Sequence, residues 1–210
     1  MNKLVNKVIT LLAIGLSISG CQNIDNKSND VENSVSSISG TSSVTTDFTD
    51  AMVVYFSATN NTKRVATSIS NIISSPIYEL KPTEPYTSAD LNYNNSSSRV
   101  SQEHNNENRH VELENVTFEG FNEAKYIFLG APVWWQELSW VINDFVSQND
   151  FTNKTIITFG TSASSGFSIN NLKLLAPNAT WTSPTRFSSS ASNNEITNWI
   201  NDLNLSQIMA

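Results

Sequence analysis

The sequence predicts an α/β fold in which a parallel sheet is covered by helices on both faces. Continuous apolar runs, typical of strands buried on both faces, occur at residues 51–56, 126–130 and 155–160. Stretches with the apolar period of an amphipathic helix alternate with these runs. The 210 residues suffice for one domain of about 150 residues with an appendage, so we expect a single core.

The first part of the domain begins with the strand at 51–56 and continues with a helix at 62–74, which Pro76 ends. A short second strand is expected at 77–80. The polar stretch 82–115 that follows shows no clear period, and we interpret it as an insertion. The apolar face of the helix consists of Val65, Ile69, Ile72 and Ile73.

The second part contains the strands at 126–130 and 155–160, a helix between them, a helix before Pro177 and a short fifth strand at 179–181. A last helix begins near Asn193, because Ser192 and Glu195 have the spacing of a capping box. The apolar stripes of these three helices are, in order, Leu138, Val141, Ile142, Phe145 and Val146; Ile169, Leu172 and Leu175; and Ile196, Trp199, Ile200 and Leu203.

The N-terminus has the pattern of a secretory signal peptide at residues 1–20, with lysines before a short apolar run. Ile18-Ser19-Gly20-Cys21 resembles the bacterial lipobox, which implies Cys21 as an acylated first residue of the mature chain. The alternative is an ordinary signal peptide with a chance cysteine. Residues 21–48 are polar and predict a flexible tether, and residues 49–205 the folded domain. We therefore expect a lipid-anchored protein at the cell membrane, facing the extracytoplasmic side.

The charge and the single cysteine exclude several classes of function. The formal net charge is −7, and without residues 1–20 there are 10 basic against 19 acidic residues, which disfavours nucleic-acid binding. Cys21 alone cannot form a disulfide, a zinc cluster or an iron–sulfur site within one chain. An acidic surface suits basic redox partners, although a generic solvated surface is the favoured explanation.

Ligands of open parallel sheets bind beyond the carboxyl ends of the strands, so the loops after the first, third and fourth strands are informative. The loop at 57–62 joins a buried strand to a helix N-terminus. Its hydroxyls and backbone N–H groups, with the helix dipole, can hold a phosphate. A plain helix cap would have a similar composition.

The other two loops suit a planar ligand. Trp134 and Trp135 follow the third strand, where an aromatic ring can stack on an indole. The alternative is that one or both pack into the core. The loop at 161–166 is small and polar, so its backbone can approach a ring closely.

These segments resemble the flavodoxin-like family, specifically a short-chain branch often found as lipoproteins. The resemblance lies in residues 54–62, 128–135 and 158–162, and in an insertion-like segment at 84–99, and it extends over about residues 52–203. It implies a three-layer sandwich with a five-stranded parallel sheet of order 2-1-3-4-5. Asn60 stands where the family usually has glycine, and asparagine is the residue that best tolerates the left-handed backbone glycine would adopt.

The resemblance also implies an FMN site and an unidentified redox partner protein or small electron acceptor. The phosphate would lie at the first loop, the isoalloxazine against Trp134 or Trp135, and its pyrimidine edge near the third loop. The implied site residues are Ser57, Ala58, Thr59, Asn60, Asn61 and Thr62; Pro132, Val133, Trp134 and Trp135; and Thr161, Ser162, Ala163, Ser164, Ser165 and Gly166.

Several residues of the insertion, and the function itself, have alternative interpretations. His104 and His110 near three glutamates could suggest a metal site, but surface loop residues are the simpler interpretation. Tyr86 and Tyr93 either cover the ligand or attach the insertion to the domain, and we favour attachment. The functional hypotheses are an FMN-dependent electron carrier or reductase, and a binding module without cofactor on the same scaffold.

Overall fold

The structure is a computed structural model that describes residues 48, 50–163 and 165–203. The predicted signal peptide, Cys21 and the predicted tether up to residue 47 lie outside these residues. None of the helices in the described part of the chain has the length and apolar character needed to cross a bilayer.

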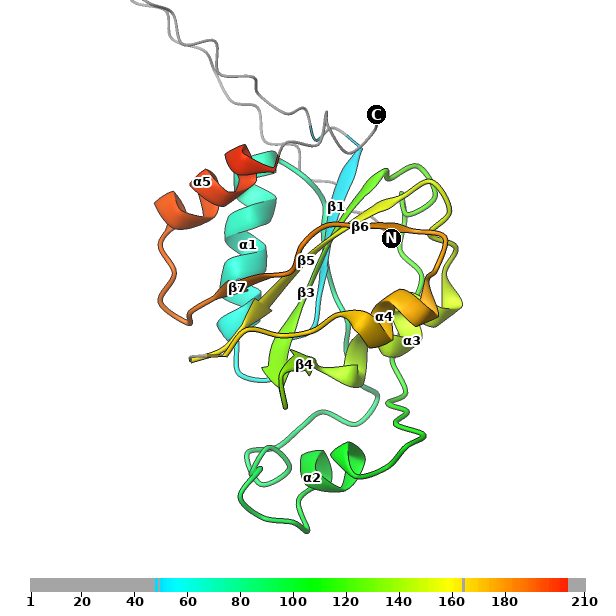
Figure 1. The fold of residues 1–210 in the computed structure, drawn as a ribbon, viewed down its shortest axis with the longest axis vertical. Helices are drawn as coiled ribbons and strands as arrows, with labels where there is room; N and C mark the ends of the chain where they lie inside the picture. Colours follow the sequence, from blue (N-terminus) through cyan, green and yellow to red (C-terminus); the bar gives the residue numbers. More distant parts are fainter. Residues whose placement is uncertain (1–47, 49, 164, 204–210) are drawn as a thin grey trace, which may run out of the picture. The chain divides into compact units, whose positions relative to one another are not determined.

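A parallel sheet forms the centre of the domain, with the order β2-β1-β3-β5-β6. Tyr126 at the start of β3 is level with Ala51 of β1 on one side and with Thr155 of β5 on the other. The carboxyl ends of the three central strands therefore lie at one edge (Figure 1). The strands are β1 Ala51–Tyr55, β2 Ile77–Glu79, β3 Tyr126–Trp134, β4 Glu137–Leu138, β5 Thr155–Thr161, β6 Thr180–Trp181 and β7 Thr185–Phe187.

The sheet has seven strands where the sequence predicted five. β6 pairs with the beginning of β5 and β7 with its end, so together they occupy the predicted fifth position. Pro184 lies between them and has no N–H to donate, which explains the interruption. β4 is the other addition, and it pairs antiparallel with the end of β3.

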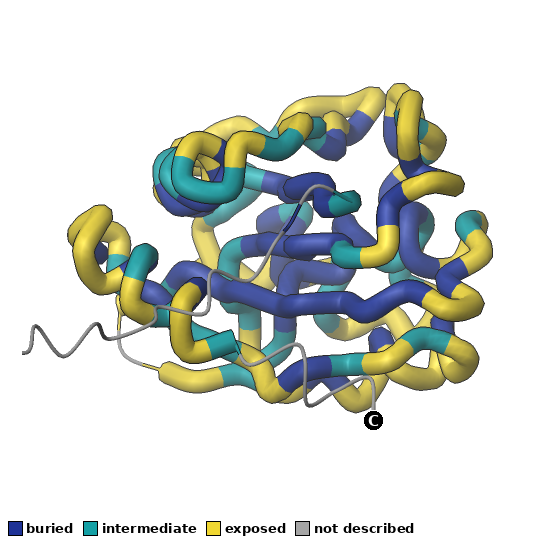
Figure 2. The backbone as a smooth tube through the Cα atoms, turned by 90° about the horizontal axis from the view of Figure 1, so that it is seen from above, coloured by how far each residue is buried: buried dark blue, intermediate teal, exposed yellow. Residues whose placement is uncertain are grey.

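Helices cover both faces of the sheet, which confirms the predicted three layers (Figure 1). α1 and α5 pack on one face, and α3 and α4 on the other, with the strands buried between them (Figure 2). The helices are α1 Asn61–Ile73, α2 Arg99–His104, the 3-10 helix η1 Trp140–Ile142, α3 Asn143–Gln148, α4 Asn170–Leu175 and α5 Asn193–Asp202.

The helix ends follow the local sequence signals. α1 ends at Ser74, whose φ of 52° is left-handed, and buries Val65, Ala66 and Ile69. Ser192 accepts a hydrogen bond of 3.1 Å from the backbone N–H of Glu195, so the predicted cap of α5 is confirmed. The stripe predicted as one helix from Leu138 instead spans β4, η1 and α3.

The polar segment after β2 has more structure than its sequence predicted. An antiparallel bridge between Pro82 and Leu113 closes its base, reinforced by a 3.0 Å hydrogen bond from the Thr83 N–H to the Glu112 carbonyl. Between these ends lies α2, which begins after the capping residue Ser98. Figure 1 shows α2 beyond the carboxyl edge of the central strands, so the insertion stands over the edge where ligands bind.

The opposite edge of the sheet is held by Lys154. Its ammonium group donates to the backbone carbonyls of Phe121, Asn122 and Ala124 at 2.8, 2.9 and 2.7 Å. The residue is 7% exposed, and its three N–H donors match three acceptors. This contact ties the segment before β3 to the start of β5.

We predict that Lys154→Met lowers the free energy of unfolding by about 3 kcal/mol, because it leaves buried carbonyls without a donor. Urea unfolding measures the effect. Lys173→Met, at an exposed position of α4, is the control and should change stability by less than about 0.5 kcal/mol. Equal stabilities of the two variants would contradict the role of Lys154.

Candidate functional site at the carboxyl edge of the sheet

The three loops singled out in the sequence meet at one edge of the sheet. The hydroxyls of Thr62 and Thr161 lie 2.7 Å apart, which joins the first loop to the third. The N–H of Ser168 donates to the carbonyl of Gln136 at 2.8 Å, which joins the third loop to the segment after β3. The predicted loops therefore lie close together at the same edge of the sheet.

The loop between β1 and α1 has the features of an anion site. Asn60 has a φ of 63°, the left-handed backbone expected there, and no side chain caps the N-terminus of α1. The hydroxyl of Ser57 is buried and has no hydrogen-bond partner. The Asn61 side chain donates to the hydroxyl of exposed Thr59 at 3.1 Å. Free N–H groups and an unpaired hydroxyl at a helix N-terminus favour a bound anion.

The basic residues beside this loop are engaged elsewhere. Lys63 pairs with Glu79 at 3.3 Å. The Arg64 guanidinium donates to the carbonyls of Ser189 and Ala191 at 3.0 and 2.8 Å, and so ties α1 to the segment before α5. An anion at the loop would depend on backbone and hydroxyl donors, as the sequence predicted.

The segment after β3 differs from the prediction. Pro132, Val133 and Trp134 belong to β3 rather than to a loop, and Trp135 and Gln136 turn the chain back into β4. Both turn residues have positive φ, 46° and 63°, as in the two-residue turns that suit twisted hairpins. The sequence lacks the Asn-Gly or Asp-Gly signal of such turns, so it predicted a loop there.

The two adjacent tryptophans have different environments. Trp134 packs edge-on against Phe56, Tyr86 and Trp140, with ring centroids 5.8, 5.4 and 5.1 Å away. Trp135 at the turn is 41% exposed. One indole thus belongs to an aromatic cluster and the other is available at the surface.

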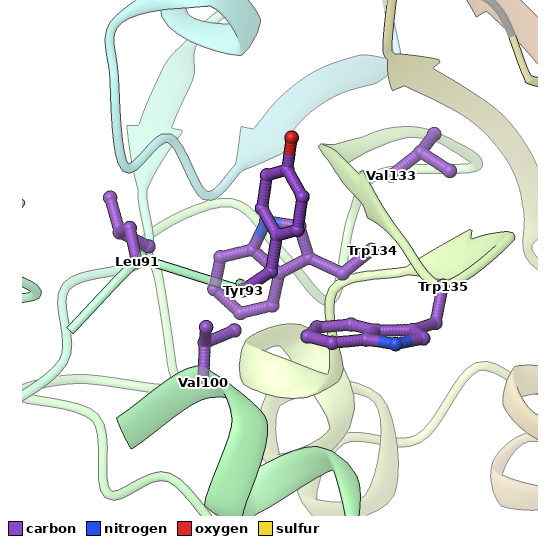
Figure 3. Close-up of a pocket in the computed structure, with 6 residues that line it drawn as sticks. All are labelled: Leu91, Tyr93, Val100, Val133, Trp134 and Trp135. Carbon is purple, nitrogen blue, oxygen red and sulfur yellow. The ribbon is translucent and has the colours of Figure 1, made fainter. Parts of the chain in front are cut away.

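A mostly apolar cavity of about 300 Å³ lies between the β3–β4 hairpin and the insertion (Figure 3). The hairpin contributes three of the predicted site residues, and the insertion contributes three that the sequence analysis did not place in the site. Tyr93 is 70% exposed at its rim. The lining residues are Val133, Trp134, Trp135, Leu91, Tyr93 and Val100. The aromatic and aliphatic lining suits a planar apolar ring.

The third loop approaches this region from β5. Thr161 is buried, whereas Ala163, Ser165 and Gly166 are exposed, and Ser164 is outside the described residues. The Ser162 hydroxyl donates to the Ser165 carbonyl at 2.6 Å, which closes the loop on itself. None of these residues lines the cavity, so of the third loop only Thr161 is joined directly to the anion site.

A second cavity of about 230 Å³ lies beside the first loop. Ser57 and Ala58 line it together with the end of β2 and the base of the insertion, including Pro82 and Tyr86. Ser57 thus lies beside open space, and its own hydroxyl is buried and unpaired.

Glu103 attaches the insertion to the domain. Its carboxylate accepts hydrogen bonds from Tyr86 at 2.6 Å, from the Trp140 indole at 2.9 Å and from Arg99 at 2.7 Å. The Arg99 guanidinium also lies 4.0 Å from the centre of the Tyr86 ring. Burial, followed by the hydrogen bond and charge of Glu103, raises the pKa of Tyr86 above its ordinary value, so the phenol stays protonated and donates. Tyr86 therefore attaches the insertion.

The histidines have no shared ligand geometry. Within the described residues, no group of three or more His, Cys, Asp or Glu side chains could hold a metal ion. His110 lies 3.2 Å from Asp144, and His104 stacks on Trp135.

An open parallel sheet with an uncapped helix N-terminus and an aromatic cavity at its carboxyl edge has the architecture of doubly wound α/β proteins, whose ligands bind at that edge. A sequence model described as flavodoxin matches residues 50–203, which is most of the chain. The protein belongs to the flavodoxin family.

Solved structures agree with this assignment. Putative flavoproteins from Bacteroides uniformis and Bacteroides eggerthii are 31% and 30% identical, with TM-scores of 0.68 and 0.66. The matches cover 73% and 77% of this chain and 98% of each relative. A flavoprotein from Lactobacillus acidophilus, solved in complex with FMN, shares the fold at 22% identity and a TM-score of 0.53, over 71% of this chain and 97% of its own. A search of curated protein sequences found no match.

We predict that Tyr86→Phe lowers the free energy of unfolding by about 1.5 to 2 kcal/mol, because a hydrogen bond to a partly buried carboxylate is lost. Tyr93→Phe removes the same atom from a side chain that is 70% exposed and should have an effect below about 0.5 kcal/mol. Urea unfolding of both variants tests the difference, and a Tyr86→Phe protein as stable as Tyr93→Phe would show that Glu103 does not need this donor.

Proposed function

We propose that this protein binds FMN and takes part in electron transfer or flavin-dependent reduction. One observation carries the proposal: the buried Ser57 hydroxyl has no partner, and it precedes an α1 N-terminus that no side chain caps. A phosphate would satisfy both, since it accepts several hydrogen bonds and is attracted by the helix dipole.

The rest of the FMN site would be divided along the edge of the sheet. Ser57, Thr59, Asn61 and the N–H groups of the first turn would hold the phosphate. The cavity at the hairpin would hold the isoalloxazine, with Trp135 as the exposed ring surface. The third loop would lie toward the polar edge of the ring, as the resemblance to the family implies.

Bound FMN would supply the ability to accept and return electrons. The chain's own part is to bind and orient. The aromatic cluster of Phe56, Tyr86 and Trp134 keeps apolar side chains beside the ring cavity and limits water there. The contact between Thr62 and Thr161 fixes the first loop relative to the third.

The flavoprotein of Lactobacillus acidophilus supports the choice of FMN, because that protein was solved with FMN on the same fold. The backbone of Asn60 supports it as well. A residue other than glycine at that position would weigh against a phosphate loop if it forced another conformation, but Asn60 adopts the left-handed backbone with a φ of 63°.

We predict that the full-length protein shifts the visible absorption bands of added FMN, and that Ser57→Ala raises the dissociation constant about tenfold. A hydrogen bond to a charged group is worth about 1.5 to 3 kcal/mol, which corresponds to a factor of ten or more. Titration of FMN into each variant, followed by absorption and by quenching of flavin fluorescence, measures the constant.

Ser75→Ala is a matched control, because Ser75 has a buried, unpartnered hydroxyl just beyond the opposite end of α1. It should bind FMN as the unchanged protein does. No spectral change with FMN at micromolar concentration would reject the proposal and favour the cofactor-free binding module. Equal affinities of the Ser57 and Ser75 variants would remove the first loop from the phosphate site.

We further propose that the domain is anchored by lipid on Cys21 at the extracytoplasmic side of the membrane. The lipobox-like sequence and the single cysteine at that position support the proposal. Several acyl chains on one residue give stable anchoring, since each buried CH₂ contributes about 0.8 kcal/mol.

We predict that the full chain, expressed in bacteria, sediments with membranes and that Cys21→Ala moves most of it to the soluble fraction. Ser36→Ala, outside the lipobox-like segment, serves as the control and should stay with the membranes. Ultracentrifugation with incorporation of labelled fatty acid measures both. Labelled lipid on the Cys21→Ala protein would contradict the assignment.

A further inference from the structure

His104 and Trp135 form the closest and most parallel ring contact at the carboxyl edge. Their ring centres lie 4.2 Å apart and their planes differ by 12°. His104 is the last residue of α2, and Trp135 is at the turn of the β3–β4 hairpin. The insertion therefore reaches the exposed tryptophan through one stacked ring.

The indole of Trp135 separates His104 from the cavity. Trp135 lines the cavity and His104 does not, so His104 covers part of the indole that is turned away from it. In Figure 3 the indole is seen nearly edge-on, and Tyr93 stands above and to the left of it, overlapping Trp134 in this view. The side of Trp135 toward Tyr93 remains available to a ligand.

Trp135 needs such support because its backbone is unfavourable. Its φ is 46°, a conformation that bulky residues rarely adopt. Strained residues persist where the surrounding contacts hold them, and they cluster at ligand sites. The stacked imidazole of His104 supplies such a contact. The ring of Trp140 supplies another, with its centre 5.9 Å from that of Trp135.

The imidazole contributes its ring face rather than a hydrogen bond from Nδ1. That nitrogen is buried and has no partner. The neighbouring residue Glu103 holds the end of α2 through its bonds to Tyr86 and Trp140, so the position of the imidazole is determined by the same helix turn.

We propose that His104 is a positioning residue for the ring site. It holds the indole of Trp135 as a platform, so that a planar aromatic ligand stacks on the side facing the cavity. The inference rests on the proposed function, in which this ligand is the ring of FMN. It assigns to the insertion the role of orienting the platform in addition to closing the cavity.

The first test compares FMN binding to His104→Leu, His104→Phe and His110→Leu in the full-length protein. Loss of the stacked ring should raise the FMN dissociation constant about fivefold in His104→Leu, since such a pair contributes on the order of 1 kcal/mol. His104→Phe keeps an aromatic face and should bind within about twofold of the unchanged protein. His110, the other histidine, pairs with Asp144 away from Trp135 and is the control.

The second test needs no FMN and separates this inference from the proposed function. Acrylamide quenching of tryptophan fluorescence in the ligand-free protein should increase in His104→Leu and not in His104→Phe. The increase should vanish in the double variant His104→Leu with Trp135→Phe, because the indole that becomes more exposed is then absent.

The outcomes are distinct. If the unchanged protein does not bind FMN, the proposed function fails, and the quenching experiment alone decides whether His104 positions Trp135. If FMN binds and His104→Leu matches the unchanged protein in both affinity and quenching, the inference is overturned. A His104→Phe variant as impaired as His104→Leu would overturn it too, because the aromatic face would then not be the property that matters.

Discussion

The carboxylate of Glu103 is the interaction on which the carboxyl edge of this protein depends. It accepts from Tyr86 and Arg99 within the insertion and from Trp140 on the main domain. The insertion has one short helix, and it buries only Val100, Val111 and Leu113 in the hydrophobic core. A charged acceptor with three donors of fixed direction adds to this burial. The contact holds α2 beside the ring cavity, which Val100 of α2 lines.

The carboxyl edge has two chemically different parts, which match the two parts of the proposed ligand. Where the chain enters α1, the Ser57 hydroxyl is buried without a partner beside a small cavity, and no side chain caps the helix. Toward the hairpin the lining becomes aromatic and aliphatic, with Trp134 packed and Trp135 exposed. A phosphate needs polar donors such as those near α1, and a flat ring needs an apolar lining such as that near the hairpin. The hydroxyl pair of Thr62 and Thr161 links the two regions across the sheet.

The family match and the folded domain coincide. The match spans residues 50–203, and the two Bacteroides structures are covered over 98% of their length. The domain is thus comparable with those flavoproteins in extent. The hydrogen bonds of Lys154 lie at the opposite edge of the sheet from the candidate site. Substitutions at that opposite edge should therefore lower the stability of the domain without changing the geometry of the loops at the carboxyl edge.

The sequence by itself determined the scaffold, and it predicted the edge of the sheet at which the candidate site lies. Short continuous apolar runs favour buried strands, and their alternation with helical stripes favours a parallel sheet, so the three layers and the carboxyl edge could be predicted. The cap at Ser192 and the left-handed Asn60 were also predictable, because they depend on neighbouring residues alone. The hairpin turn at Trp135 and the contacts of Glu103 and His104 were decided by the tertiary structure. They join segments distant in sequence, and no local pattern marks which polar or aromatic side chains will meet.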